Sequence, residues 1–211
     1  MRLKLVLLAL SVLAALPARA GDWLDDAQWT AATTAIPGAP PPPPGRGTDW
    51  IPYDPPSRLF SGLLPPKGWR PYETEDALGT VDRILGPDDP SGLLRATLSV
   101  RYEERDSPGF LPARDAVAAM RRSGPDRSAT PVMPLRLEMG LARIFEVTLR
   151  RRLPLDAGPS RSLALHEYVA VIPRGEDYFV VRLLTTRGSY LDYKSFFVRF
   201  LKELRALGGG R

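Results

Sequence analysis

The sequence contains few residues of the types that usually carry catalysis or bind metals. It has no cysteine and one histidine, His166, which excludes thiolate nucleophiles, disulfides and multi-histidine metal sites. His166 precedes Glu167, as in the zinc-protease motif H-E-x-x-H, but that motif needs a second histidine. A general base also needs a nucleophile and an orienting partner, and no motif around His166 supplies them. We therefore expect a structural or surface histidine.

Acidic pairs are the next candidates for chemistry. They occur at Asp88-Asp89, Glu103-Glu104 and Glu176-Asp177, and such pairs at turns and strand ends are usually solvated. Asp88, Asp89 and Ser91 could offer oxygens to calcium, but they lack the central glycine and distal glutamate of a calcium loop. Phosphate-binding glycine loops and the nucleophile elbow are missing too. We predict no catalytic, cofactor-binding or metal-binding residue, and we expect that the protein is not an enzyme.

The densest positive charge is Arg150-Arg151-Arg152, at the end of a predicted strand, with Arg161 entering the next strand. One interpretation is a sheet edge that charge keeps soluble. The other is a site for an anionic partner, either phospholipid headgroups or an acidic protein surface. Exposed aromatic residues do not alternate with these arginines, so a groove for single-stranded nucleic acid is not expected.

Trp50 and Tyr53 are further candidate contact residues. They lie in Thr48-Asp49-Trp50-Ile51-Pro52-Tyr53, which is too aromatic for an inert spacer. They could dock on the folded domain, or the segment could be recognised in extended form by a partner. Together with the four arginines they form our set of candidate partner-binding residues.

Residues 1–20 are typical of a secretory signal peptide. Arg2 and Lys4 precede the apolar run Leu5–Leu16, and Ala18-Arg19-Ala20 offers a cleavage site. We expect cleavage, with an uncleaved anchor as the alternative. Without the three basic residues of this segment, the formal net charge falls from +5 to +2, which weakens a nucleic-acid interpretation. We expect a periplasmic or extracellular protein, with no cysteine to carry a lipid.

The remaining chain divides into three predicted parts. Residues 21–62 form a Pro-rich lead, in which Pro40–Pro44 favours the polyproline II conformation. Residues 63–207 form the folded domain, and residues 208–211 form a flexible tail.

Within the domain, residues 94–102 alternate between apolar and polar side chains, as in a half-buried strand. The other predicted elements are strands at 69–73 and 80–85, a turn at 86–92, a helix at 112–122, hairpins at 132–152 and 163–186, and a helix at 190–206. The last helix carries an apolar stripe: Tyr193, Phe196, Phe197, Phe200, Leu201 and Leu204. This order indicates an α+β fold with an antiparallel β-sheet flanked by helices.

Residues 68–207 resemble the PsbP-like fold family. The resemblance is carried by Gly68-Trp69, the strand at 94–102, the helix near 113–122, and Tyr178-Phe179-Val180-Val181-Arg182-Leu183 followed by Phe196-Phe197 and Phe200-Leu201. It implies an α/β/α-layered antiparallel sheet and an extracytoplasmic accessory, adaptor or assembly role. Bacterial members are often lipoproteins, and this chain departs from them in lacking the lipid-bearing cysteine.

We therefore expect an exported, non-enzymatic accessory or adaptor protein. It would bind an envelope protein or a membrane-associated complex through its folded domain and its lead, without nucleic acid or cofactor, and as a monomer. The alternative is a small-molecule or lipid carrier with a pocket between the sheet and the C-terminal helix. An enzyme that uses carboxylates or tyrosines, and a structural envelope component, also stay open.

Overall fold

The computed structural model describes residues 50–207, except residues 66, 77–78, 90–91, 93 and 154–160. The predicted signal peptide, most of the Pro-rich lead and the tail at 208–211 lie outside the described residues. For Arg161 the structure describes the backbone alone.

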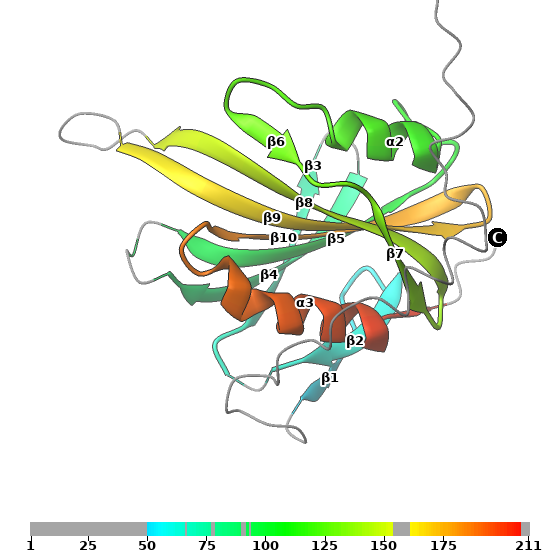
Figure 1. The fold of residues 1–211 in the computed structure, drawn as a ribbon. Helices are drawn as coiled ribbons and strands as arrows, with labels where there is room; N and C mark the ends of the chain where they lie inside the picture. The colour runs from blue at the N-terminus through cyan, green and yellow to red at the C-terminus, as the bar shows by residue number, and fades with distance from the viewer. Residues whose placement is uncertain are drawn as a thin grey trace, which may run out of the picture.

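The main sheet has eight strands, in the order β3-β4-β5-β10-β9-β8-β6, with β7 also paired to β8 (Figure 1). All of these pairings are antiparallel. The strands are β3 (Arg70–Asp76), β4 (Gly79–Asp88), β5 (Arg95–Glu103), β6 (Arg127–Ala129), β7 (Met133–Leu137), β8 (Gly140–Leu153), β9 (Arg161–Arg174) and β10 (Asp177–Thr186). The antiparallel sheet and both hairpins predicted from the sequence are confirmed.

A second sheet of three strands lies beside the C-terminal helix (Figure 1). It consists of β1 (Ile51–Tyr53), β2 (Phe60–Leu64) and β11 (Arg205–Ala206), in the order β1-β2-β11. Phe60 and Leu64 are buried in the same apolar cluster as the C-terminal helix. The predicted start of the domain at residue 63 therefore falls inside β2, and residues 50–62 pack with the domain rather than leading to it.

The two α-helices are α2 (Ala113–Met120) and α3 (Tyr190–Glu203). In α3 the predicted apolar stripe faces inward: Phe196, Phe197, Phe200 and Leu201 are buried, and so is Leu204 just after the helix. The predicted helix at 190–206 is three residues too long, because Arg205 and Ala206 leave it to pair with Ser61 and Phe60.

Apolar side chains pack on both faces of the main sheet. In β9, Tyr168, Ala170 and Ile172 belong to the cluster that contains α3 and the small sheet, whereas Val169 and Val171 belong to the cluster that contains α2. This division follows from strand alternation, which sends successive side chains to opposite faces. One continuous strand thus supports two apolar clusters.

The space between the main sheet and α3 is filled by aromatic rings. Trp69 stacks on Phe196 with ring centroids 4.2 Å apart, and Tyr168 stacks on Phe197 at 5.6 Å. Phe200 has no exposed surface. The pocket that the carrier alternative placed between sheet and C-terminal helix is therefore occupied by core side chains.

The turn predicted at 86–92 begins too early. β4 continues to Asp88, which pairs with Arg95 across a register shift that follows Leu85. The Arg95 guanidinium donates to both carboxylate oxygens of Asp88 at 2.9 Å, and this pair extends the two strands beyond the apolar alternation. β6 was not predicted, because three residues give too short a pattern to recognise.

Candidate functional site

An exposed, charged feature lies where β8 and β9 run past their neighbours. The β9–β10 pairing ends at Leu165, and the β6–β8 pairing ends at Leu149. Beyond these points, residues 150–153 and 161–164 pair with each other as a two-stranded ribbon, which projects from the sheet in Figure 1. We call these residues the arginine arm.

The arginine arm carries Arg150, Arg151 and Arg152, all of which are exposed. None of the three side chains makes an ion pair or hydrogen bond with a described residue. Alternation along β8 places Arg150 and Arg152 on the α3 side of the ribbon and Arg151 on the α2 side. The triplet predicted as a single patch is thus divided between two faces, and Arg161 joins it by the backbone pairing with Leu153.

Trp50 and Tyr53, the two aromatic candidates, pack against the domain. Tyr53 is buried, with its ring centroid 6.1 Å from that of Phe60. Trp50 is half-buried, with its ring 5.5 Å from Phe196, and the Arg199 guanidinium lies 4.3 Å from its ring centroid. Of the two interpretations, docking on the domain is the one that this geometry matches.

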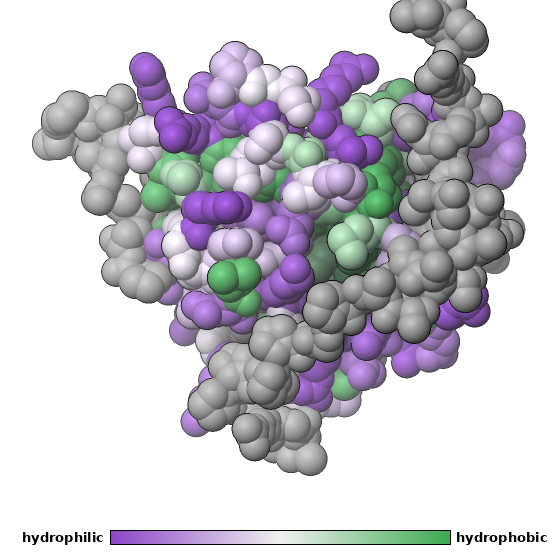
Figure 2. Space-filling model, in the orientation of Figure 1, coloured by the Kyte–Doolittle hydropathy of each residue, from purple (hydrophilic) through white to green (hydrophobic). Residues whose placement is uncertain are grey.

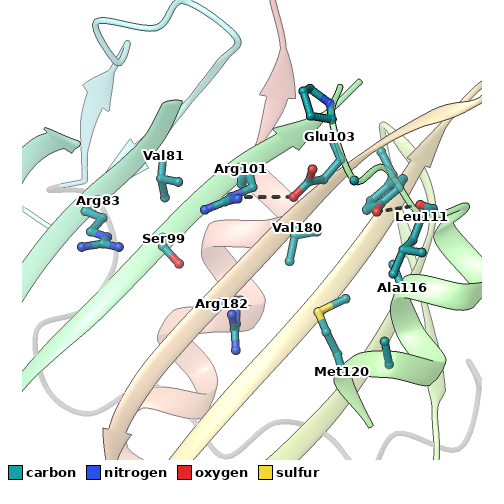
Figure 3. Close-up of a pocket in the computed structure, with 14 residues that line it drawn as sticks. Val81, Arg83, Ser99, Arg101, Glu103, Leu111, Ala116, Met120, Val180 and Arg182 are labelled. Atoms are coloured by element: carbon teal, nitrogen blue, oxygen red, sulfur yellow. Dashed lines mark hydrogen bonds and ion pairs between the residues drawn. The ribbon is translucent and has the colours of Figure 1, made fainter. Parts of the chain in front are cut away.

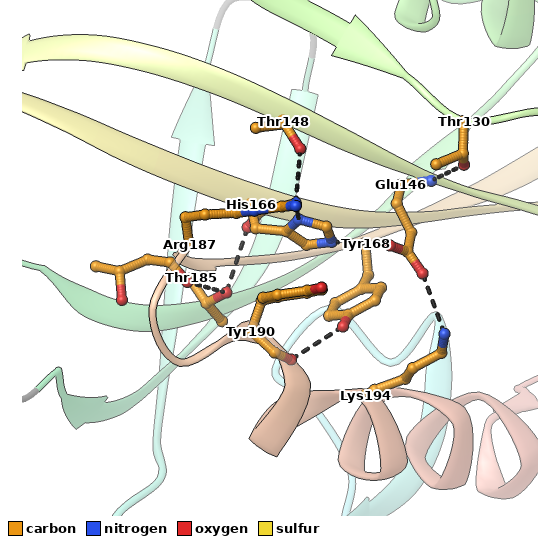
Figure 4. A network of polar contacts seen from close by, with 10 residues as sticks. Thr130, Glu146, Thr148, His166, Tyr168, Thr185, Arg187, Tyr190 and Lys194 are labelled. Carbon is orange, nitrogen blue, oxygen red and sulfur yellow. Dashed lines mark hydrogen bonds and ion pairs between the residues drawn. The ribbon is translucent and has the colours of Figure 1, made fainter.

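His166 lies at the centre of a polar cluster between β8, β9 and the start of α3 (Figure 4). It is 1% exposed. Its Nε2 lies 3.1 Å from a carboxylate oxygen of Glu146, and its Nδ1 lies 3.0 Å from the Arg187 guanidinium. Because a guanidinium can only donate, Nδ1 is the acceptor in its contact with Arg187.

The charges around Glu146 stabilise its ionised form. The His166 ring, and then Lys194 with its Nζ 3.3 Å away, hold the pKa of Glu146 below its usual value, although partial burial opposes them. Burial raises the pKa of the Tyr168 hydroxyl, which donates to the Tyr190 carbonyl at 2.9 Å.

The His166 cluster joins the sheet to the start of α3. Both ring nitrogens of His166 face charged partners, Glu146 and Arg187, and Arg187 also donates to the Thr148 hydroxyl at 3.1 Å. No hydroxyl among the described residues is placed to give its proton to the histidine. His166 is therefore buried rather than on the surface, and it contacts Glu146 of β8 and Arg187, which precedes α3.

A cavity of about 320 Å³ opens on the opposite face of the main sheet, beside α2 (Figure 3). We call it the α2 hollow. Its polar lining comes from β4, β5 and β10: Arg83, Ser99, Arg101, Glu103 and Arg182. Its apolar lining includes Leu111, Ala116, Met120, Tyr178 and Val180. The Tyr178 hydroxyl donates to the Leu111 carbonyl at 2.9 Å, which ties the segment before α2 to β10.

The three arginines of the α2 hollow differ in their partners. Arg182 pairs with Glu167 through two contacts of 2.8 and 2.9 Å, and Arg101 lies 3.7 Å from Glu103. Arg83 is exposed and forms no ion pair or hydrogen bond with any residue that the structure describes. The hollow was not predicted, because its polar residues are far apart in the sequence and only strand pairing brings them together.

The surface shows no reason to expect a large apolar interface among the described residues. Figure 2, in the orientation of Figure 1, shows a mixture of hydrophilic side chains and smaller hydrophobic areas on this face of the molecule. The large exposed hydrophobic side chains come from five separate parts of the chain: Ile51, Tyr72, Leu111, Met133 and Leu191. Singly exposed apolar residues are normal on protein surfaces.

The described residues contain no group of three or more histidines, aspartates and glutamates that could hold a metal ion. The Asp88 carboxylate, one of the possible calcium ligands, is engaged by Arg95, which holds the pKa of Asp88 below its usual value. Asp89 accepts from the Leu94 amide at 3.3 Å. Ser91 lies outside the described residues. In the part of the chain that the structure covers, no helix has the length and apolar character needed to span a membrane.

No family model and no curated protein sequence matches the chain. Among solved structures, cyanobacterial PsbP from Synechocystis sp. PCC 6803 is similar, with 15% identity and a TM-score of 0.46 over 79% of this chain and 98% of that one. LpqN of Mycobacterium tuberculosis, described as involved in cell envelope biogenesis, is similar with 13% identity and a TM-score of 0.45 over 77% and 88% of the two chains. The PsbP-like resemblance noted in the sequence thus recurs among structural neighbours. At this similarity their functions are not transferred to this chain.

Proposed function

We propose that this protein is an exported, non-enzymatic accessory protein that binds an acidic surface of an envelope protein through the arginine arm. The observation that carries the proposal is the geometry of the arm, which projects beyond the sheet with three exposed arginines. Arginine is the residue best suited to bind carboxylates, because its planar guanidinium can donate two parallel hydrogen bonds.

The division of the arginines between two faces supports a partner that contacts the arm from both sides. Arg150 and Arg152 project from one face and Arg151 from the other, so a flat surface would reach one set alone. A groove or cleft lined by aspartate and glutamate would reach both. Because these exposed arginines have no carboxylate partner among the described residues, they keep their hydrogen-bonding capacity for such a groove.

Export rests on the predicted signal peptide, and the absence of catalysis rests on the chemistry of the described residues. The two ring nitrogens of His166 lie 3.1 Å from Glu146 and 3.0 Å from Arg187, and the sequence contains no cysteine. The Pro-rich lead, predicted to be extended, would separate the domain from whatever holds the N-terminal part of the chain.

The test is capture of partners from the cell envelope of the source organism with the tagged protein. The variant Arg150→Gln/Arg151→Gln/Arg152→Gln removes three exposed positive charges. A matched control, Arg70→Gln/Arg122→Gln/Arg136→Gln, removes three from exposed positions elsewhere. If each exposed pair contributes about 0.5 kcal/mol, the loss of three pairs should weaken partner binding roughly tenfold, while both variants keep the wild-type melting temperature.

A third variant without residues 21–49 separates the arm from the lead. This deletion spares β1 and β2, which a deletion to residue 62 would remove. Loss of the partner in the arm variant, with retention in the control, supports the proposal. If the arm variant retains the partner as well as the wild type does, the arginine arm is not the binding site. Recovery of lipid vesicles without an enriched protein would instead favour phospholipid headgroups as the anionic partner.

A further inference from the structure

The α2 hollow contains a row of hydrogen-bond donors that crosses three neighbouring strands. Ser99 of β5 pairs directly with Arg83 of β4 on one side and with Arg182 of β10 on the other. Neighbouring strands lie about 4.8 Å apart, so the two arginine backbones are about 10 Å apart with the serine midway. Figure 3 shows the three side chains on the same face of the sheet.

The charges of this row are not balanced. Glu167 accepts from Arg182, and Glu103 lies near Arg101, but no described carboxylate pairs with Arg83. The Ser99 hydroxyl is half-buried and makes no hydrogen bond with a described residue. The Arg182 side chain is 41% exposed, and its Nη1 makes no hydrogen bond with a described residue. An oxyanion above Ser99 would meet donors from both sides.

The other half of the hollow is apolar. Ala116 and Met120 of α2 lie opposite Val180 of β10, and Leu111 closes one end. Ala116 and Val180 belong to the apolar cluster between α2 and the sheet. The hollow therefore offers a charged end and an apolar end within about 320 Å³, a volume typical of the smaller sites for organic ligands.

We infer that the α2 hollow binds a small amphiphilic oxyanion, a carboxylate or phosphate monoester with an aliphatic tail. The oxyanion head lies over Ser99 between Arg83 and Arg182, and the tail lies against Met120, Val180 and Leu111. Arg83 is the specificity-determining residue, because it is the arginine whose charge the ligand neutralises. This site is separate from the arginine arm, so it is tested without the envelope partner.

The experiment is a titration of the purified ¹⁵N-labelled protein with four probes, followed by NMR chemical shifts. Octanoate and octyl phosphate carry the proposed head and tail, octyltrimethylammonium reverses the charge, and acetate lacks the tail. We expect saturable shifts at Ser99, Val180 and Met120 with octanoate or octyl phosphate. The tighter of these two probes identifies the head group. We expect no saturable shift at these residues with octyltrimethylammonium, and much weaker binding of acetate.

Two substitutions that each remove one positive charge test the role of Arg83. Arg83→Gln should weaken binding about tenfold, because a charge-assisted hydrogen bond is lost. Arg136→Gln, at an exposed arginine of β7 that does not line the hollow, should leave binding unchanged. Both positions are exposed, so both variants should melt at the wild-type temperature.

Three results would overturn the inference. One is the absence of saturable shifts at the hollow with both octyl oxyanions. Another is binding of octyltrimethylammonium as tight as that of octanoate, which would show that the aliphatic tail alone determines affinity. The third is an equal loss of binding affinity in Arg83→Gln and Arg136→Gln. That result would show that the net charge of the protein, and not the position of Arg83, determines binding.

Discussion

Replacing Phe60 by alanine tests whether the small sheet belongs to the folding unit. The Phe60 side chain is 0% exposed, and its ring centroid lies 6.1 Å from that of Tyr53 and 6.4 Å from that of Phe200. It thus connects β2 to the buried face of α3. If residues up to 62 were only a lead, the same substitution would have almost no effect on stability.

The structure gives the size of the expected effect. Truncating a fully buried phenylalanine to alanine costs about 3–5 kcal/mol, the sum of lost apolar burial and the cavity left behind. Each kcal/mol lowers the melting temperature of a domain of this size by about 2–4 °C, so we expect a decrease of roughly 6–20 °C. Since whole domains are stable by only about 5–15 kcal/mol, Phe60→Leu provides a milder variant, because it removes fewer buried atoms than alanine does.

The assay is urea unfolding of the purified variants, with thermal melting followed by circular dichroism. Ile51→Ala is the matched control, because Ile51 is a 51% exposed residue of the same small sheet. We expect its free energy of unfolding to change by less than about 0.5 kcal/mol. If Phe60→Ala proves as mild as Ile51→Ala, then the small sheet does not stabilise the domain and our placement of its start is wrong.

Two further predictions concern the sheet face that α3 covers. A Cβ added at Gly86 would lie 2.9 Å from the indole of Trp69, so Gly86→Ala should cost about 1–3 kcal/mol in urea unfolding through overpacking. Because the folded-state pKa of Glu146 is lowered by its contact with His166, the ionised carboxylate stabilises the fold above its unfolded pKa of about 4.3. This contribution is lost as the pH falls through the folded pKa. Glu146→Gln should therefore be about 1 kcal/mol less stable than wild type at pH 7, and the difference should narrow in unfolding curves recorded towards pH 3.

Matched variants accompany both predictions. An added Cβ at Gly188 would meet no atom within 4 Å, so Gly188→Ala should be almost neutral. A cost at Gly86 no larger than at Gly188 would mean that Trp69 can move aside. Glu104→Gln removes an exposed carboxylate outside the His166 cluster and is the matched control for the pH series. The same pH profile for Glu146→Gln and wild type would contradict the role given to His166.

Local patterns predicted the hairpins and α3, because these elements depend on residues close in the sequence. The apolar stripe around Phe196 and Phe200 follows the helical period, and Met139-Gly140 and the residues after Pro173 mark turns. β1 and β2 lack such a pattern. The prolines in and around β1 indicate a linker, and β2 pairs on its other edge with Arg205 and Ala206, about 145 residues later.

The candidate site residues also divide into those that local sequence could predict and those that depend on distant parts of the chain. The exposure of Arg150–Arg152 could be predicted from charge alone, whereas the burial of Tyr53 could not, because it depends on Phe60 and α3. The α2 hollow gave no signal in the sequence. Arg83, Ser99 and Arg182 are isolated polar residues in three strands, and a single serine or arginine in a strand has no pattern that separates it from a solvated side chain.

The amino-acid sequence by itself determined the chemical repertoire of this protein and its main elements. Composition excluded thiol and multi-histidine chemistry, and periodicity placed the hairpins and the C-terminal helix. The tertiary structure decided which side chains meet. Strand register placed Arg83, Ser99 and Arg182 in one row, and strand alternation divided Arg150–Arg152 between two faces. Long-range contacts brought Tyr53, Phe60 and Leu64 into the core. Register and long-range pairing join residues that are distant along the chain, and local propensity carries no information about such contacts.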